Sequence, residues 1–130
     1  MKLIVLRVFV RDWPRALRFY TETVGLPLAF SSEEMGWAQL DTGTCQLALE
    51  RARDESEEEM GGPLVGRFVG ASLAVDDVQA TYEALRARGV EFVAPPERMP
   101  WGGVLAHFRD PDGNVLTLVG TPRPVTPPPA

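Results

Sequence analysis

The sequence predicts an α+β fold built from two tandem βαβββ modules, and two observations lead to this prediction. Two stretches of the chain share one order of strand, aspartate, helix and glycine at nearly the same spacing, and each is followed by a hairpin pattern. The length of 130 residues, 45% of them hydrophobic, is near the usual size of one compact domain with a sizeable core. We therefore expect a single domain at 1–120, with module one at 3–50 and module two at 67–120.

A strand and a helix begin each module. Ile4 to Val10 and Ala71 to Val75 are rich in β-branched and aliphatic residues, which is typical of strands. Asp12 and Asp77 follow these strands at the position of a helix N-cap. The apolar residues that come next have the spacing of one helical face, and Pro14 suits a first helical turn.

Glycines end both predicted helices, and hairpins close both modules. Gly25 lies thirteen residues after its N-cap aspartate and Gly89 lies twelve residues after its own, as C-terminal caps would. A short apolar segment follows each glycine. The hairpins are expected at 37–49, around Asp41-Thr42-Gly43-Thr44, and at 104–119, around Asp110-Pro111-Asp112-Gly113-Asn114. Chance similarity between the halves is the alternative to this repeat.

Two segments lie outside the modules. Residues 51–66 contain the acidic run 54–59 beside Gly61-Gly62-Pro63, which indicates a solvated acidic linker; the alternative is an acidic lid that attracts a cationic ligand. The proline-rich tail at 121–130 is expected to be disordered.

Charge and composition exclude some classes of binding partner and favour one cellular compartment. With 13 basic and 18 acidic residues, the net charge of −5 repels nucleic acid and anionic membrane surfaces. No apolar run reaches the length of a signal peptide or membrane span. The single cysteine, Cys45, is expected to be a buried apolar residue and fits a reducing compartment. We expect a cytoplasmic protein with no nucleic-acid or membrane partner.

Several motifs resemble those of the vicinal oxygen chelate superfamily, which includes glyoxalases, extradiol dioxygenases and bleomycin-resistance proteins. The resemblance covers about residues 3–119 and lies in Val8-Phe9-Val10-Arg11-Asp12, Phe19-Tyr20, Gly25-Leu26 and Phe108-Arg109-Asp110-Pro111-Asp112-Gly113-Asn114. It implies that the two modules form a cup-shaped, curved mixed sheet with helices on the outer face. It also implies a cup that is often completed across a homodimer.

Strand alternation indicates which side chains face the cup, because successive residues of a strand point to opposite faces. The apolar set of the first strand, from Ile4 to Val10, is expected to face the helices. The polar and aromatic residues expected to bind a ligand are Arg7, Gln46, Glu50, Ser72 and Thr117, with Trp37 and Trp101 from adjoining segments. Arg7 either clamps a carboxylate or pairs with Glu50, and Trp101 either stacks on a ligand or caps the core or a dimer contact.

The metal positions that the resemblance implies do not hold metal ligands. Metal-using members bind a divalent ion through four side chains drawn from His, Glu and Gln. The resemblance places these positions at Val5, Ala48, Gly70 and Thr117. Three of these residues have no side-chain donor atom, and a threonine hydroxyl alone is a poor ligand set. We therefore expect no metal and no cofactor.

Three functions remain open, and whether the protein is an enzyme remains open with them. The first is a metal-free small-molecule-binding protein of the glyoxalase/bleomycin resistance type, which holds an aromatic or cationic ligand in a cup at a homodimer. The second is a metal-independent lyase or isomerase that uses His107, the single histidine, as a catalytic base, paired with Arg7 or Glu50. The third is a metal-dependent glyoxalase- or dioxygenase-like enzyme, if the ligand positions are misassigned.

Overall fold

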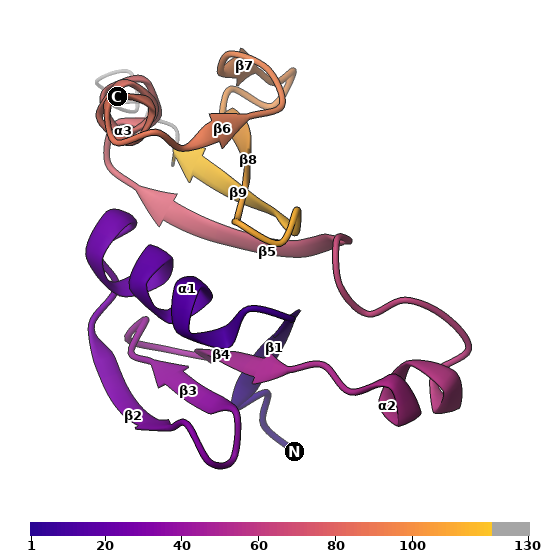
Figure 1. The fold of residues 1–130 in the computed structure, drawn as a ribbon. Coiled ribbons are helices and arrows are strands. Elements are labelled where there is room, and N and C mark those ends of the chain that lie inside the picture. The colour runs from indigo at the N-terminus through magenta and orange to yellow at the C-terminus, as the bar shows by residue number, and fades with distance from the viewer. Residues whose placement is uncertain (121–130) are drawn as a thin grey trace, which may run out of the picture. The chain divides into compact units, whose positions relative to one another are not determined.

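The computed structural model describes residues 1–120, so the predicted tail at 121–130 lies outside the described residues. The chain forms two compact units: Met1–Val69 with Asp110–Val115, and Gly70–Arg109 with the residues from Leu116 onward. Figure 1 labels the helices and strands of both units.

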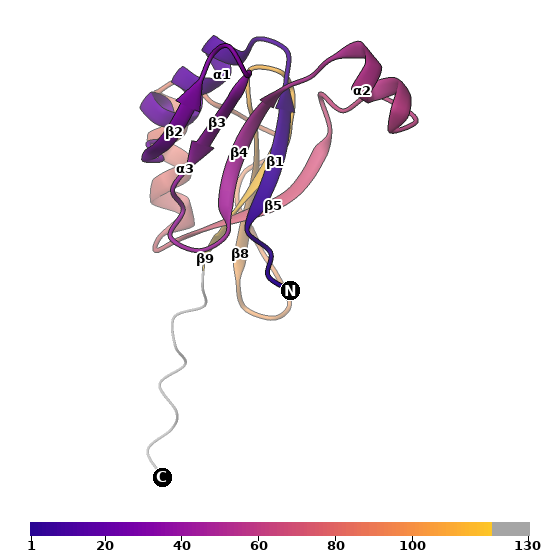
Figure 2. The same cartoon turned by 90° about the horizontal axis from the view of Figure 1, so that it is seen from below.

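The first unit contains a four-stranded sheet in the order β1-β4-β3-β2. Figure 2 shows these strands side by side. Strand β1 is parallel to β4, and the other neighbours are antiparallel, so the sheet is mixed. Its strands are β1 (Val5–Val10), β2 (Leu28–Ser32), β3 (Trp37–Leu40) and β4 (Gln46–Arg51).

Helix α1 (Trp13–Arg18) covers one face of this sheet and packs against β4. The Asp12 side chain accepts a hydrogen bond from the Arg15 amide at 3.2 Å, which confirms the predicted N-cap. The helix continues through an unpredicted π-helical turn, η1 (Phe19–Thr23), and the chain then turns at Gly25 with φ of +91°. The buried side chains on the helix-covered face of the sheet include Val8, Val10, Ala38, Leu40, Leu47 and Leu49.

A second sheet repeats the strand order of the first. It runs β5-β9-β8-β6, which matches β1-β4-β3-β2 strand for strand, and a short extra strand, β7, also pairs with β8. Its elements are β5 (Phe68–Val75), α3 (Val78–Ala87), β6 (Glu91–Phe92), β7 (Glu97–Arg98), β8 (Val104–Arg109) and β9 (Val115–Gly120). The predicted repeat and the α+β class are therefore confirmed.

Helix α3 covers its sheet as α1 covers the first. Asp77 caps the helix by accepting from the Ala80 amide at 3.0 Å, and the helix packs against β8. The rings of Tyr82 and Phe92 lie 4.7 Å apart in an edge contact, and those of Phe92 and Phe108 lie 6.0 Å apart. This aromatic contact joins the helix to β6 and β8, so the polar residues of β8 are left on the opposite face.

The acidic linker contains a helix that the sequence did not lead us to expect. Helix α2 (Asp54–Glu59) forms there because glutamate is a good helix former and acidic side chains in a first turn favour the helix N-terminus. Arg11 forms ion pairs with Glu57 and, at 3.9 Å, with Asp54. The prediction for Cys45 was wrong, because its side chain is half-buried at the strand end rather than buried.

The closing hairpin turns at Asp110-Pro111-Asp112-Gly113-Asn114, and Asp110 organises this turn. One carboxylate oxygen of Asp110 accepts from the amides of Asp112 and Asn114, each at 2.9 Å. The other oxygen accepts from the Tyr20 hydroxyl and from the Asn114 side chain, each also at 2.9 Å. Gly113 has φ of +84°, a conformation that favours glycine. The turn is therefore fixed to the helical segment of the first unit.

Burial shifts the pKa values of Asp110 and Tyr20 in this cluster. It raises the pKa of the Asp110 carboxyl, and the hydrogen bonds from Asn114 and Tyr20 offset part of that rise. Burial, and then the charge of Asp110, raise the pKa of the Tyr20 phenol well above its usual value. Tyr20 is therefore a protonated hydrogen-bond donor at neutral pH.

Removing the Tyr20 hydroxyl is expected to destabilise the protein in a pH-dependent way. The pKa of Asp110 is higher in the folded protein than in the unfolded chain. The contribution of Asp110 to the free energy of unfolding is therefore fully present below the usual aspartate pKa and is lost as the pH rises through the pKa of the folded state. The Tyr20 hydrogen bond limits this loss by favouring the carboxylate. Tyr20→Phe should therefore lower the free energy of unfolding by about 1–3 kcal/mol at neutral pH and by less in acid.

Denaturant titrations across the acid range measure this difference. Tyr82→Phe is the matched control, because the Tyr82 hydroxyl bonds to Arg86 and not to a carboxylate. Its effect should not vary with pH in the range where carboxylates titrate. Equal destabilisation by Tyr20→Phe at acidic and neutral pH would contradict the proposed coupling to Asp110.

Candidate functional site

The first sheet has a face opposite α1 on which polar and aromatic side chains gather. The strand register places Arg7 beside Ala48 and Gln39, and Phe9 beside Glu50 and Trp37. The register with β2 then adds Phe30 and Ser32. We call this set the Arg7 face: Val5, Arg7, Phe9, Phe30, Ser32, Trp37, Gln39, Gln46, Ala48 and Glu50.

An ion pair lies on the Arg7 face. The guanidinium of Arg7 and the carboxylate of Glu50 are 3.3 Å apart, so the pairing that was one of two alternatives for Arg7 is present. The guanidinium also lies over the Phe9 ring, 5.3 Å from its centroid. The Arg7 side chain remains 53% exposed, which leaves guanidinium donors available to a ligand.

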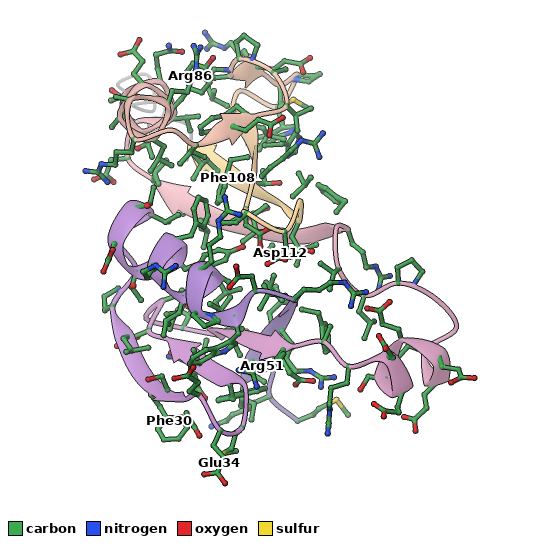
Figure 3. The ribbon with its side chains drawn as sticks, viewed as in Figure 1. Phe30, Glu34, Arg51, Arg86, Phe108 and Asp112 are labelled. Atoms are coloured by element: carbon green, nitrogen blue, oxygen red, sulfur yellow. The ribbon has the colours of Figure 1, made fainter. Side chains whose placement is uncertain are left out.

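Two aromatic side chains share the Arg7 face with this ion pair. Trp37 is half-buried on β3 next to Glu50. Phe30 projects from the edge strand β2 and is 52% exposed, which is high for so large an apolar side chain (Figure 3). Together with the ion pair, these rings form a surface on which an aromatic group can stack while polar atoms reach charged partners.

Gln39 and Phe30 lie on this face but were missing from the sequence prediction. Alternation along Trp37-Ala38-Gln39-Leu40 was the available signal for Gln39, because Ala38 and Leu40 are buried on the helix side. Phe30 had no such signal, because a bulge between Leu28 and Phe30 shifts the register of β2. Gln46, which was predicted, donates to Asp41 at 3.4 Å.

The second sheet also has a polar face opposite its helix. Nδ1 of His107 and Oγ1 of Thr117 lie 2.8 Å apart, across neighbouring strands β8 and β9. Thr117 is buried, His107 is half-buried, and Ser72 on β5 is exposed. The Trp101 ring lies against Gly103, where an added Cβ would come within 1.8 Å of it, yet Trp101 is 56% exposed.

The residues at the implied metal positions do not fit a divalent ion. In the first unit, Val5 and Ala48 have no side-chain donor atom. In the second, Gly70 has φ of +79°, a backbone conformation that a residue with a metal-binding side chain would adopt only with strain. The Thr117 hydroxyl is hydrogen-bonded to His107. Within residues 1–120, no group of three or more His, Cys, Asp and Glu side chains could hold a metal ion. The donor atoms at these four positions therefore do not support metal chemistry.

Comparison with known proteins identifies the family. Residues 2–118 match the model of the family described as Glyoxalase/Bleomycin resistance protein/Dioxygenase superfamily. The chain belongs to this superfamily. The resemblance inferred from the motifs is therefore confirmed, and the repeated modules of this glyoxalase-superfamily protein agree with the fold that the resemblance implied.

Three relatives illustrate the range of this superfamily. The chain is 31% identical over 125 residues to the uncharacterized protein YraH of Bacillus subtilis (strain 168), covering 91% of this chain and 97% of that protein. It is 27% identical to the bleomycin resistance protein of Klebsiella pneumoniae, covering 84% of each chain. It is also similar to the crystal structure of TnmS3, an antibiotic binding protein from Streptomyces sp. CB03234, at a TM-score of 0.74 and 33% identity, covering 95% of this chain and 97% of that one.

The structure also bears on membrane association. Across the 120 residues that the structure describes, none of the helices has the length and apolar character needed to cross a bilayer.

Proposed function

We propose that this protein is a small-molecule-binding protein of the bleomycin resistance type, which binds an aromatic or cationic ligand without a metal ion. The Arg7 face is the observation that supports it most directly. Trp37 and Phe30 offer flat apolar surface, and the Arg7–Glu50 pair between the strands offers both donors and acceptors. Such a surface favours a planar aromatic group with polar substituents.

The relatives and the charge support the same ligand class. One relative is a bleomycin resistance protein, and a structural neighbour with 33% identity is an antibiotic binding protein. The net charge of −5 attracts cations at long range and so favours encounters with positively charged molecules. Val5, Ala48 and Gly70 have no side-chain donor atoms, so the residues at the implied metal positions do not support a metal-dependent mechanism.

A fluorescence screen tests this proposal. The chain has three tryptophans, and Trp37 lies on the proposed binding surface. Titration with a panel of aromatic cations, bleomycin included, should change the tryptophan emission in a saturable way for at least one compound. If every compound leaves the emission unchanged, and calorimetry with the same panel records no heat of binding, the proposal is wrong.

We further propose that this protein binds its ligand as a homodimer. Large apolar side chains stand exposed in the first unit, at Leu3, Ile4 and Phe68, which are 75%, 70% and 64% exposed. Exposed apolar surface of this kind is typical of protein contact sites. Sedimentation equilibrium should give about twice the chain mass of 14.3 kDa, and a monomer at micromolar concentration would contradict the dimer.

A second candidate function is a metal-independent lyase or isomerase based on His107. The 2.8 Å contact between Nδ1 of His107 and Thr117 favours it, because a partner on one ring nitrogen fixes the orientation of the imidazole, the side chain best suited to act as a general base. If a reaction is found, His107→Ala should slow it by about 10²–10⁴-fold. An unchanged rate in that variant would exclude His107 as the base.

A further inference from the structure

A groove lies between the C-terminal end of helix α3 and strand β6, at the edge of the second sheet. It encloses about 610 Å³ and is lined by residues between 82 and 95, so it lies wholly within the second unit. Binding sites for small molecules range from about 300 to 1,000 Å³. The groove is therefore large enough for an organic ligand, and no residue of the Arg7 face contributes to it.

Much of the lining of this groove is apolar. Val90 is buried and Phe92 is half-buried, while Val93 is 50% exposed and Pro95 is also exposed. The Phe92 ring is held in place by its edge contact with Tyr82. An alkyl or aryl group would lose contact with water against these side chains, which favours its binding.

Arg86 and Tyr82 provide polar groups in the groove. They lie one helical turn apart on α3, so their side chains are neighbours. Nη1 of Arg86 donates to the Tyr82 hydroxyl oxygen at 3.1 Å, and the guanidinium carbon lies 5.3 Å from the centroid of the Tyr82 ring (Figure 3). These two contacts orient the guanidinium before any ligand binds.

Both side chains keep hydrogen-bond donors for a ligand. A guanidinium has five N–H donors, and the bond to Tyr82 uses one of them. The Tyr82 hydroxyl accepts that bond, so its own hydrogen can still be donated. Tyr82 is only 7% exposed, and a donor in so buried a side chain needs an acceptor. A carboxylate can accept from both groups at once.

The charge around Arg86 also favours an anion. Among the described residues, Arg86 has no ion pair with a carboxylate. Two acidic residues near it in the sequence have other partners: Glu83 accepts from Gln79 at 3.1 Å, and Glu91 lies 3.6 Å from Arg109. A carboxylate bound here would therefore gain charge-assisted hydrogen bonds, although the net charge of the protein is −5.

We propose that this groove is a binding site for a small organic acid, whose carboxylate accepts hydrogen bonds from the Arg86 guanidinium and the Tyr82 hydroxyl. The alkyl or aryl group of the acid lies against Phe92, Val93 and Pro95. The site is additional to the Arg7 face, so this inference does not depend on the proposed function.

NMR of the tyrosine rings tests the site. The chain has two tyrosines, Tyr20 and Tyr82, so a protein labelled in its tyrosine rings gives two sets of signals, which Tyr82→Phe assigns. The full-length protein is titrated at constant pH and ionic strength with phenylacetate, and separately with neutral phenylacetamide, with benzylammonium and with inorganic phosphate. Phenylacetate should shift the Tyr82 signals in a saturable way, with a Kd in the low millimolar range. The other three compounds should not, and the signals of Tyr20, which is buried in the first unit, should not move.

Variants of Arg86 test the role of the guanidinium. Arg86→Gln should weaken the binding of phenylacetate about tenfold. Arg86→Lys keeps the charge but not the planar fork of donors, so its affinity should be intermediate. Arg98→Gln is the matched control, because Arg98 is an exposed residue of β7 in the same unit that does not line the groove. It loses the same charge and should bind phenylacetate as the unmodified protein does.

Four results would each overturn the site. Phenylacetate may leave the Tyr82 signals unmoved, or phenylacetamide or phosphate may shift them as strongly as phenylacetate does. Arg86→Gln may bind phenylacetate as tightly as the unmodified protein, or Arg98→Gln may weaken the binding as much as Arg86→Gln does. The last result would assign the effect to net charge rather than to the groove.

Discussion

Replacing Asn114 with alanine is expected to lower the free energy of unfolding by about 2–4 kcal/mol. Asn114 is fully buried, and its side chain joins three segments of the first unit. Its oxygen accepts from the amides of Gly66 and Arg67, at 2.8 and 3.3 Å, while its nitrogen donates to the Phe9 carbonyl and to Asp110, each at 2.9 Å. Alanine would leave these groups without their partner and remove one of the bonds that stabilise the Asp110 carboxylate.

Chemical denaturation measures this loss, with Asp76→Ala as the control. Asp76 is an exposed residue between β5 and α3, and its replacement should change the stability by less than about 0.5 kcal/mol. If Asn114→Ala were as stable as the control, the closing turn would not fasten β1 and the linker as we describe. The motif Asp110-Pro111-Asp112-Gly113-Asn114 would then need another explanation.

Replacing Trp37 with alanine is expected to weaken ligand binding by about 10- to 100-fold. Trp37 is the largest aromatic side chain of the Arg7 face and lies beside Glu50, so its loss removes stacking next to the ion pair. Trp37→Phe keeps a flat ring and should lose less. Calorimetry with the compound found in the screen measures both variants, and circular dichroism checks that both are folded.

Ser31→Ala is the control for the Trp37 prediction. Ser31 lies on the neighbouring strand β2 opposite Ala38, so its side chain points to the other face of the sheet. Its replacement should leave the affinity unchanged. Unchanged affinity in Trp37→Ala would place the ligand elsewhere and remove the main support for the Arg7 face as the binding surface.

The sequence predicted the repeat well because each module has strong local signals. Asp12 and Asp77 are N-caps with measurable hydrogen bonds, and Gly25 and Gly89 both have φ near +90°. These features depend on a few neighbouring residues, which a sequence displays directly. Helix α2 was missed because a charge run beside Gly and Pro also fits an irregular linker.

The candidate site could be predicted only in part. Alternation placed Arg7 and Glu50 on one face, because both strands are regular and parallel. Phe30 was missed because it follows an irregularity, a bulge in β2. At such places the period of two is broken, and facing can no longer be counted along the chain.

The central claim is that this superfamily member binds its ligand without a metal ion. The most direct test is to measure the affinity for the aromatic cation found in the screen after exhaustive dialysis against a chelator, and again with added divalent ions. We predict the same saturable binding in both conditions, and metal analysis should find no stoichiometric ion in the purified protein. Binding or turnover that disappears with the chelator and returns with one divalent ion per site would contradict the claim.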